Sequence, residues 1–214
     1  MHVLTENLWF PHPNDSDADG FLALGGDLSV QRLLLAYHSG IFPWFEKGGP
    51  ILWWSPDPRM VLFPEKFKIS KSLRKTLNSE KFTITLNQDF PQVINACAQI
   101  PRRGETGTWI TYEMQTAYNN LHTFGYAVSV EVWQDDNLVG GLYGIDLQDK
   151  KIFCGESMFS LVTDASKVAF YYLVEHLKTK NYRLIDCQIY NPHLESLGAE
   201  EIERELFLRM LATP

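Results

Sequence analysis

The stretch IFCGESMFS, residues 152–160, begins with large apolar residues and then places Glu156 among small and apolar neighbours. Further along, LIDCQIY, residues 184–190, repeats the pattern with Asp186 and Gln188. Both stretches have the apolar run that is typical of a buried strand, and each run ends in a carboxylate. A carboxylate in a covered sheet needs hydrogen-bond or charge partners, so these two strands mark a place where the chain requires charge.

Asp186 and Gln188 stand two positions apart, so a regular strand would place both side chains on one face. If the two strands are neighbours, their ends meet at one cleft, where α/β sheets commonly bind ligands. A structural polar network is the competing interpretation for any single buried carboxylate. Two strands with the same feature favour a functional site.

The pattern around these strands predicts a mixed sheet with helices on its faces, an α/β or α+β fold. Asp135 and Asp136 form a hairpin signal between two of the strands. From the strand at 82–87 onward the order is β-α-α-β-β-β-α-β-α, which is also the order of the acetyltransferase-like fold. The expected strands are 82–87, 126–134, 137–146, 151–157 and 183–190, and the expected helices are 71–77, 89–99, 111–125, 164–181 and about 200–212, with a loop at 100–109.

Residues 1–62 form an expected smaller N-terminal domain, and residues 63–214 the acetyltransferase-like domain. The smaller part is rich in proline, glycine and tryptophan. One helix is predicted at 31–40, after the turn at Gly25 and Gly26 and a cap at Asp27 or Ser29. Prolines in IFPWF, 41–45, and ILWWSPDPR, 51–59, limit these stretches to short strands and ordered loops.

Composition excludes several classes of protein. The net charge is −7, from 26 acidic and 19 basic residues, so a general nucleic-acid coat is not expected. No signal peptide or apolar run of membrane-spanning length is recognisable. The three cysteines form no CxxC and fit a reducing cytoplasm, and Cys154 and Cys187, on predicted strands, are expected to be small core residues. The six histidines show no metal-ligand spacing, so no metal is predicted. An acetyltransferase-like sheet would carry a glycine-containing loop for the pyrophosphate of coenzyme A between its fourth strand and the next helix. The segment at that place here, residues 157–167, contains no glycine, which disfavours a coenzyme A donor.

Two further features have both a structural and a functional interpretation. Trp44 and Trp109 lie in stretches with proline or glycine, where they either pack in the core or stack on a base. The basic stretch KFKISKSLRK, residues 66–75, is either a solvated face or a track for phosphates.

The sequence resembles the leucyl/phenylalanyl-tRNA–protein transferase family. The resemblance is carried by GGDLS (25–29), GIFPWF (40–45), PILWWSPDPR (50–59), GTWI (107–110), FCGESMFS (153–160), ASK (165–167) and LIDCQ…SLGA (184–199). It implies an enzyme that moves leucine, phenylalanine or less often methionine from aminoacyl-tRNA to proteins that begin with Arg or Lys, and so marks them for degradation. No metal or coenzyme A cofactor is implied.

The resemblance also implies roles for individual residues. The catalytic residues fall on Asp186, Gln188 and Glu156. The amino-acid pocket and the other contacts fall on three further sets: Leu142, Phe153, Met158, Leu173, Leu177 and Ile185 for the side chain of the amino acid; Tyr37, Trp44 and Trp109 for the terminal adenosine; and Lys71, Arg74 and Lys75 for tRNA. Relatives have a methionine where this chain has Leu142, and aromatic residues at Leu173 and Leu177, so the preference between leucine and phenylalanine depends on the changed pocket shape.

The donor is an activated ester, so holding the amine against the carbonyl supplies much of the rate. Glu156 and Asp186 are expected to bind the cationic acceptor, with Asp186 orienting Gln188 and taking the amine proton. Two alternatives remain open. The order of the elements is compatible with a coenzyme A-dependent acyltransferase, and the tryptophans and the basic helix are compatible with a non-catalytic binder of RNA ends or peptides. The chain is expected to be a monomer, because no heptads occur.

Overall fold

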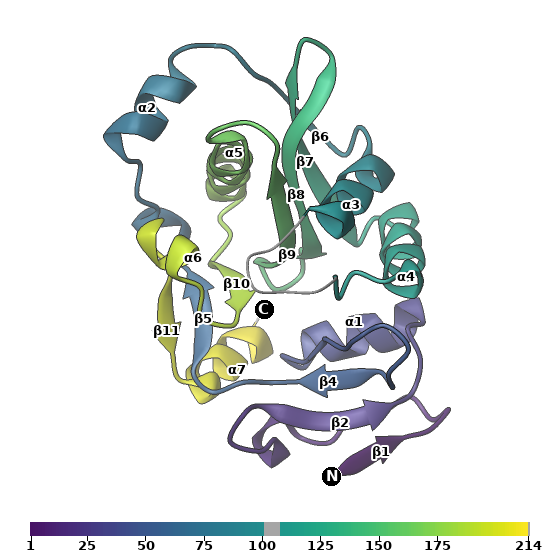
Figure 1. Cartoon of the computed structure of the whole chain (residues 1–214). Coiled ribbons are helices and arrows are strands. Elements are labelled where there is room, and N and C mark those ends of the chain that lie inside the picture. Colours follow the sequence, from purple (N-terminus) through teal and green to yellow (C-terminus); the bar gives the residue numbers. More distant parts are fainter. Residues whose placement is uncertain (101–107, 214) are drawn as a thin grey trace.

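The computed structural model describes residues 1–100 and 108–213 of the chain. The part of the predicted loop at 101–107 lies outside the described residues. The described residues form two sheets, with helices α1 and α7 between them (Figure 1). The predicted mixed α/β class is confirmed, and the N-terminal part, for which only short strands and loops were expected, also forms a sheet.

The small sheet has the strand order β1-β2-β4-β3. Among its described strands, β1 and β2 alone pair in parallel. The strand β3 lies at an edge, where a proline such as Pro43 is tolerated because it does not interrupt the hydrogen bonds of a central strand. The strands β1 and β2 were not predicted. The elements of this part of the chain are β1 (His2–Leu4), a 3₁₀ turn (Pro13–Asp15), β2 (Phe21–Gly25), α1 (Val30–His38), β3 (Phe42–Pro43) and β4 (Leu52–Trp54).

The large sheet has the order β11-β5-β10-β9-β8-β7-β6. Its one parallel pair among the described strands is β9 with β10, and α5 makes the crossover between them. The strands are β5 (Arg59–Leu62), β6 (Thr83–Leu86), β7 (Ala127–Gln134), β8 (Asn137–Leu147), β9 (Ile152–Ser160), β10 (Leu184–Gln188) and β11 (Glu200–Ile202).

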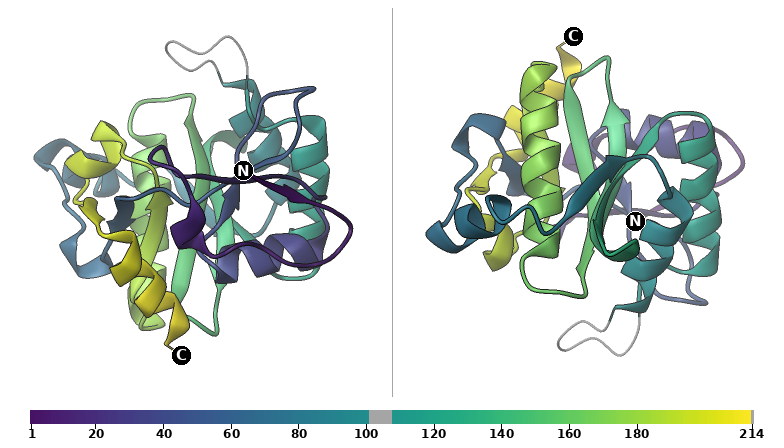
Figure 2. Two further views of the ribbon diagram at one scale, coloured as in Figure 1. Left: turned by 90° about the horizontal axis from the view of Figure 1, so that it is seen from below. Right: turned by 90° about the horizontal axis from the view of Figure 1, so that it is seen from above.

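Helices cover both faces of this sheet, α5 on one side and α3 with α4 on the other (Figure 2). Successive side chains of β9 point to opposite faces of the sheet. Phe153 therefore packs with α5, whereas Ile152 and Cys154 pack in the core on the other face. The helices are α2 (Lys71–Leu77), α3 (Phe90–Gln99), α4 (Tyr112–Thr123), α5 (Ala165–Thr179), α6 (Pro192–Ser196) and α7 (Arg204–Ala212), with a 3₁₀ turn at Pro64–Lys66.

Most helices begin where the sequence predicts. Ser29, Ser70, Asp89 and Thr111 each accept a hydrogen bond from a backbone N–H in the first turn of their helix. The C-terminal region differs from the prediction. Residues 200–202 form β11 and not the start of the last helix, which begins only at Arg204, and α6 was not predicted.

The two sheets share one hydrophobic core. Leu33 and Tyr37 of α1 and Trp53 of β4 pack in the same cluster as Tyr118 of α4 and Phe207 of α7. The strand β5 directly follows the small sheet in the chain, yet it pairs with β10 and β11. The expected division of the chain between residues 62 and 63 stays a prediction, and β5, on its N-terminal side, belongs to the large sheet.

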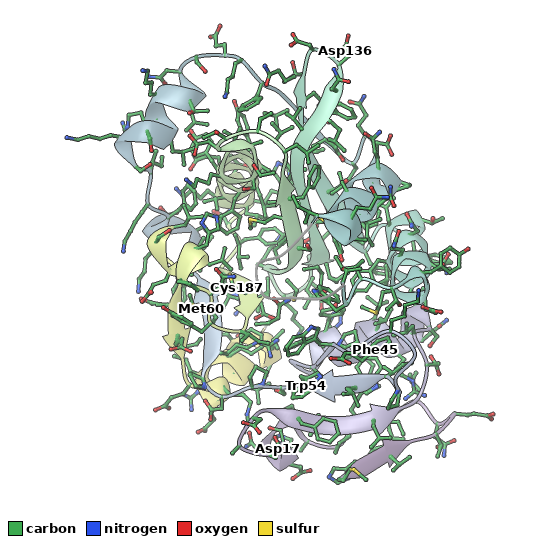
Figure 3. The ribbon with its side chains drawn as sticks, viewed as in Figure 1. Asp17, Phe45, Trp54, Met60, Asp136 and Cys187 are labelled. Carbon is green, nitrogen blue, oxygen red and sulfur yellow. The ribbon has the colours of Figure 1, made fainter. Side chains whose placement is uncertain are left out.

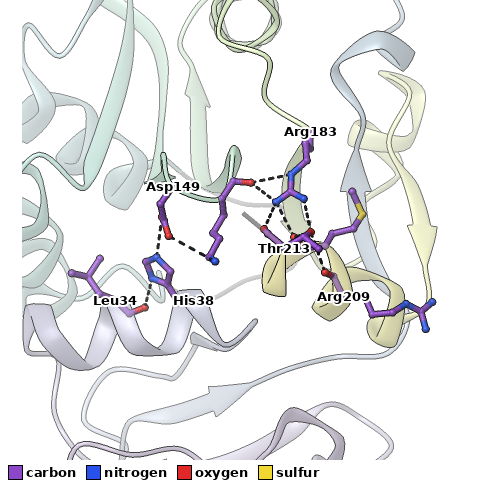
Figure 4. A network of polar contacts seen from close by, with 8 residues as sticks. Leu34, His38, Asp149, Arg183, Arg209 and Thr213 are labelled. Atoms are coloured by element: carbon purple, nitrogen blue, oxygen red, sulfur yellow. Dashed lines mark hydrogen bonds and ion pairs between the residues drawn. The ribbon is translucent and has the colours of Figure 1, made fainter.

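Polar contacts also join the parts (Figure 4). His38, at the end of α1, bonds Asp149 in the turn between β8 and β9 over 3.1 Å. Arg183 donates to the carbonyl of Lys150 and to the carbonyls of Met210 and Thr213, and so fastens the end of α7 to the same turn. These contacts fix α1 and α7 against the large sheet.

Candidate active site

A pocket of about 850 Å³ opens between the large sheet, α5, α6 and the β3 segment of the small sheet. Cys187 of β10, labelled in Figure 3, lines this pocket, whereas Met60 of the neighbouring strand β5, also labelled there, does not. Glu156 and Gln188 face this pocket together with Trp44 and Trp109. The pocket therefore brings together residues from four separate stretches of the chain.

Glu156 lies inside β9, which continues to Ser160, so the prediction that the strand ends at this carboxylate is wrong. The pairing with β8 explains how a charge is accommodated there. Gly144 faces Gly155 and Tyr143 faces Ser157, so Glu156 is the extra residue of a β-bulge. Bulges redirect a side chain and occur near active sites.

The carboxylate of Glu156 is held by three polar neighbours. Tyr118 donates its hydroxyl to Oε2 over 2.9 Å, and Gln188 donates its side-chain amide to Oε1 over 3.2 Å. The hydroxyls of Tyr37 and Tyr118 are hydrogen-bonded to each other. Burial raises the pKa of Glu156 to about 7, against the lowering effect of the hydrogen bonds from Tyr37 and Tyr118. Glu156 can therefore change its charge near neutral pH.

Asp186 does not line the pocket and is only 1% exposed. Its two carboxylate oxygens accept hydrogen bonds from Arg59, Oδ1 from Nε over 2.8 Å and Oδ2 from Nη2 over 2.7 Å. This bidentate pair balances the buried charge. In this arrangement Asp186 has no free charge for an incoming cation, contrary to the expectation from the sequence.

Gln188 reaches the pocket because β10 is irregular at its end. The pairing with β5 skips Cys187, and Gln188 has a φ of 61°. The backbone N–H of Gln188 donates to Asp186 Oδ1 over 3.1 Å. The prediction that Asp186 and Gln188 share one face of a regular strand is therefore wrong. Asp186 lies in the core and Gln188 in the pocket, joined by this one hydrogen bond.

Two of the three residues assigned to adenosine face the pocket. Trp44 is 43% exposed, and its backbone carbonyl accepts a hydrogen bond from the indole of Trp54. Trp109 is half-buried at the same opening. Tyr37 does not line the pocket: it is buried behind Glu156, where burial and then the negative charge of Glu156 raise the pKa of its hydroxyl well above its ordinary value.

Five of the six residues assigned to the amino-acid pocket line its apolar part: Leu142, Phe153, Met158, Leu173 and Ile185. The sixth, Leu177, is buried in the core one turn further along α5 and does not line it. Phe170, one turn before Leu173, lines the pocket and was not predicted.

Comparison with known proteins gives two matches to family models. The leucyl/phenylalanyl-tRNA protein transferase model covers residues 61–212, and the model of the N-terminal domain of the same family covers residues 26–57. The chain belongs to the leucyl/phenylalanyl-tRNA–protein transferase family. The resemblance inferred from the motifs is confirmed, as is the prediction of an aminoacyltransferase.

Transferases of this family from several bacteria are similar over nearly the whole chain. The protein from Flavobacterium johnsoniae is 59% identical over 99% of both chains. The one from Thermodesulfovibrio yellowstonii is 55% identical over 98% of this chain and 85% of its own. Among solved structures, L-PGS from Bacillus licheniformis is 11% identical with a TM-score of 0.44, over 79% of this chain and 53% of that one.

The residues that the family resemblance assigns to tRNA lie on α2. Lys71, Arg74 and Lys75 are all exposed, and none takes part in an ion pair within the ranges 1–100 and 108–213. Figure 1 shows α2 at the corner of the molecule far from the small sheet. The basic face therefore does not border the small sheet.

Other expectations concern absences. Within the described part of the chain, no cluster of three or more His, Cys, Asp or Glu side chains could hold a metal. No helix there is both long and apolar enough to cross a membrane. All three cysteines are buried, and burial raises the pKa of the thiols of Cys154 and Cys187. Neither of these two thiols is therefore activated as a nucleophile.

Sequence reasoning missed Arg59 and Tyr118, which contact the predicted carboxylates. Tyr118 lies on the buried face of α4, four positions after Met114, where the helical pattern predicts an ordinary core residue. Arg59 closes the motif SPDPR, and nothing local indicates that it is buried. Arg59 contacts Asp186 only because β5 pairs with β10, and no signal in the sequence predicts that pairing.

Proposed function

We propose that this chain transfers leucine or phenylalanine from aminoacyl-tRNA to the α-amino group of proteins that begin with Arg or Lys. The observation that supports this most is the set of residues that line the pocket of about 850 Å³. Apolar side chains, the Glu156–Gln188 pair and two tryptophans all line it. An aminoacyl-adenosine has the same three parts: an apolar side chain, a reactive ester and a base.

The donor binds with its amino-acid side chain against Leu142, Met158 and Leu173. Such a pocket discriminates by shape, and one methylene changes binding by about 1–3 kcal/mol. Large unbranched or γ-branched apolar side chains are therefore accepted with limited selectivity. Trp44 and Trp109 hold the terminal adenosine, because an aromatic face stacks on any base.

The acceptor amine attacks the ester carbonyl from the side of Glu156 and Gln188. With its amide nitrogen directed at Glu156, Gln188 can accept an amine N–H through its amide oxygen. Glu156, with a pKa near 7, takes the proton that the amine loses. The new C–N bond forms, the ester C–O bond breaks, and the leaving ribose hydroxyl takes up a proton, so the reaction balances without a net proton change.

Asp186 acts in this proposal through Gln188 and not on the amine. Its carboxylate is already paired with Arg59, and its Oδ1 accepts the backbone N–H of Gln188. This replaces the role suggested by the sequence, in which Asp186 itself removes the proton. Glu156 is the carboxylate that both faces the pocket and titrates near neutral pH.

The basic residues of α2 bind the tRNA backbone. Lys71, Arg74 and Lys75 project from one exposed helix of an acidic chain, and local charge governs association more than net charge does. We further propose that the enzyme acts as a monomer in the cytoplasm, where aminoacyl-tRNA is made, and that the new apolar first residue marks the product for degradation.

The test is a transfer assay with labelled Leu-tRNA or Phe-tRNA and three peptides that differ only in their first residue: Arg, Lys or Ala. Label on the Arg and Lys peptides alone supports the proposal. Binding of aminoacyl-tRNA without transfer to any peptide would support a non-catalytic binder, and acylation from acetyl-coenzyme A would support the other class of enzyme.

A further inference from the structure

Arg59 is a buried cation that touches neither the pocket nor the solvent. Its side chain is 1% exposed, and it lies on the face of β5 that also carries Val61. Val61 faces Asp186 across the β5–β10 pairing, so strand alternation directs Arg59 and Asp186 to the same side of the sheet. This side is the core shared with α1 and α7.

All three guanidinium nitrogens of Arg59 are used. Nε and Nη2 donate to the two oxygens of Asp186, and Nη1 donates to the backbone carbonyl of Gly40 over 3.2 Å. The Cζ atom lies 4.9 Å from the centre of the Phe42 ring and 4.7 Å from the centre of the Phe207 ring. The position of the group is thus fixed by hydrogen bonds in its plane and by aromatic rings.

On one side, the contacts of Arg59 lead to Gln188. Asp186 Oδ1 accepts from Arg59 Nε and also from the backbone N–H of Gln188. Gln188 has a left-handed φ of 61°, which a residue with a side chain adopts only when its surroundings hold it there. Any shift of the Asp186 carboxylate therefore changes the position of the amide that faces Glu156.

On the other side, the contacts lead to the wall formed by β3. Gly40 begins the segment that continues through Phe42 and Pro43 to Trp44, and these last three residues line the pocket. Gly40 has a φ of 75°, and a Cβ atom there would approach Leu208 to 2.7 Å. Because the backbone at Gly40 is closely packed, its carbonyl is a fixed point for Nη1.

We propose that Arg59 is a positioning residue for aminoacyl transfer, one that holds Gln188 and the Phe42–Trp44 wall in a single geometry. The inference rests on the proposed function, because it assumes that these two walls receive the amine and the adenosine. A planar fork is required: a lysine would keep the charge, but its single nitrogen could not hold both oxygens of Asp186 and the Gly40 carbonyl.

The experiment compares Arg59→Lys with Arg32→Lys in the full chain. Arg32 is a matched control, since it is also fully buried, with bonds to Asp27 and to the carbonyls of Thr5, Glu6 and Asn7, away from the pocket. Transfer from Leu-tRNA to a peptide that begins with Arg is measured below the melting temperature of both variants. Arg59→Lys should lower kcat by about tenfold or more and raise KM for Leu-tRNA, whereas Arg32→Lys should change both by less than about twofold.

A folded Arg59→Lys variant with kcat within about twofold of the unaltered chain would overturn the inference, as would an equal loss in Arg32→Lys. If Arg59→Lys does not fold, the double variant Arg59→Met, Asp186→Leu gives the same test, because a buried ion pair is often replaced by apolar residues without loss of stability. That variant should also lose about tenfold or more in kcat, and near-normal turnover would overturn the inference. An unaltered chain that transfers nothing would refute the proposed function instead.

Discussion

The side-chain amide of Gln188 donates a hydrogen bond to Glu156 over 3.2 Å, and so connects the irregular end of β10 with the bulge of β9. Both deviations from regular strand geometry are needed for this contact. Without the bulge, Glu156 would be paired with a residue of β8. Without the skipped residue in β10, the side chain of Gln188 would point to the same buried side of the sheet as that of Asp186. The site is therefore built from two local irregularities in neighbouring parallel strands.

The first prediction concerns Glu156 as the group that takes the amine proton. Transfer should rise with pH through about 7, the pKa of Glu156. Glu156→Gln should lower the rate by about 10²–10⁴ and leave only the titration of the acceptor amine. Tyr118→Phe removes a hydrogen bond that lowers this pKa, so its pH profile should move to higher pH. A pH–rate profile of the three proteins measures this, and an unchanged profile in Glu156→Gln would refute the role.

The second prediction concerns stability and the same carboxylate. The pKa of Glu156 is raised from 4.5 to about 7 in the folded protein, so the folded state binds the proton more tightly than the unfolded one. The resulting stabilisation is fully present below about pH 4.5 and is lost as the pH rises through about 7. It is on the order of 3 kcal/mol.

Glu156→Gln lacks this contribution. As the pH rises from about 5 to about 8, the unaltered chain should therefore lose unfolding free energy relative to Glu156→Gln. Urea unfolding at the two pH values measures it. A difference that stays constant between them would show that the pKa of Glu156 is not raised in the folded protein.

The third prediction concerns the buried pair of Asp186 and Arg59. Asp186→Asn leaves the guanidinium without its matching charge and should lower the unfolding free energy by about 3–5 kcal/mol. Glu205→Gln, which breaks the exposed pair with Arg209, is the control and should change it by less than about 1 kcal/mol. Transfer by Asp186→Asn, measured where it is folded, should also fall, and near-normal turnover would dismiss a role for this carboxylate in the reaction.

The fourth prediction concerns the shape of the apolar pocket. Leu173 lines the pocket, whereas Leu177, one turn along the same helix, does not. Leu173→Ala and Leu177→Ala should each lower the unfolding free energy by about 2–5 kcal/mol. Only Leu173→Ala should shift the preference toward phenylalanine over leucine, by about tenfold or more. Competition between the two charged tRNAs measures the ratio, and equal shifts in both variants would contradict the assignment of the pocket.

The fifth prediction concerns the basic residues of α2. Replacing Lys71, Arg74 and Lys75 with alanine should raise KM for Leu-tRNA and leave the maximal rate nearly unchanged. The slope of log KM against log salt concentration should fall by about 0.7–0.9 for each phosphate contact that is lost. Arg209→Ala, on α7, removes a cation elsewhere and should leave the slope as it is. Transfer assays over a range of salt concentrations test both.

Local patterns predicted much of the fold. The helices 71–77, 89–99 and 111–125 match because cap residues and apolar spacing are both visible in the sequence. The β7–β8 hairpin matches because Asp135 and Asp136 adopt the positive φ of a two-residue turn, at 49° and 61°. The short strands β1, β2 and β11 were missed, because strands of three to five residues depend on partners far away in the chain.

The sequence predicted which residues form the site better than it predicted how they are arranged. The motifs identified Glu156, Asp186 and Gln188. Strand alternation, however, predicted a regular strand, whereas the pairing of β10 with β5 skips Cys187. The partner of Asp186 lies 127 positions earlier in the chain, and no local pattern connects two residues at that separation. Buried ion pairs of this kind become visible only when the strands are placed side by side.

The position of β5 has a consequence for fragments of the chain. This strand is inserted between β10 and β11, although the chain reaches it before any other strand of the large sheet. A piece that starts at residue 63 would therefore leave the hydrogen-bonding groups along one side of β10 exposed to solvent. Such an open border recruits strands from other molecules, so this piece should precipitate or exchange segments with its copies instead of folding alone.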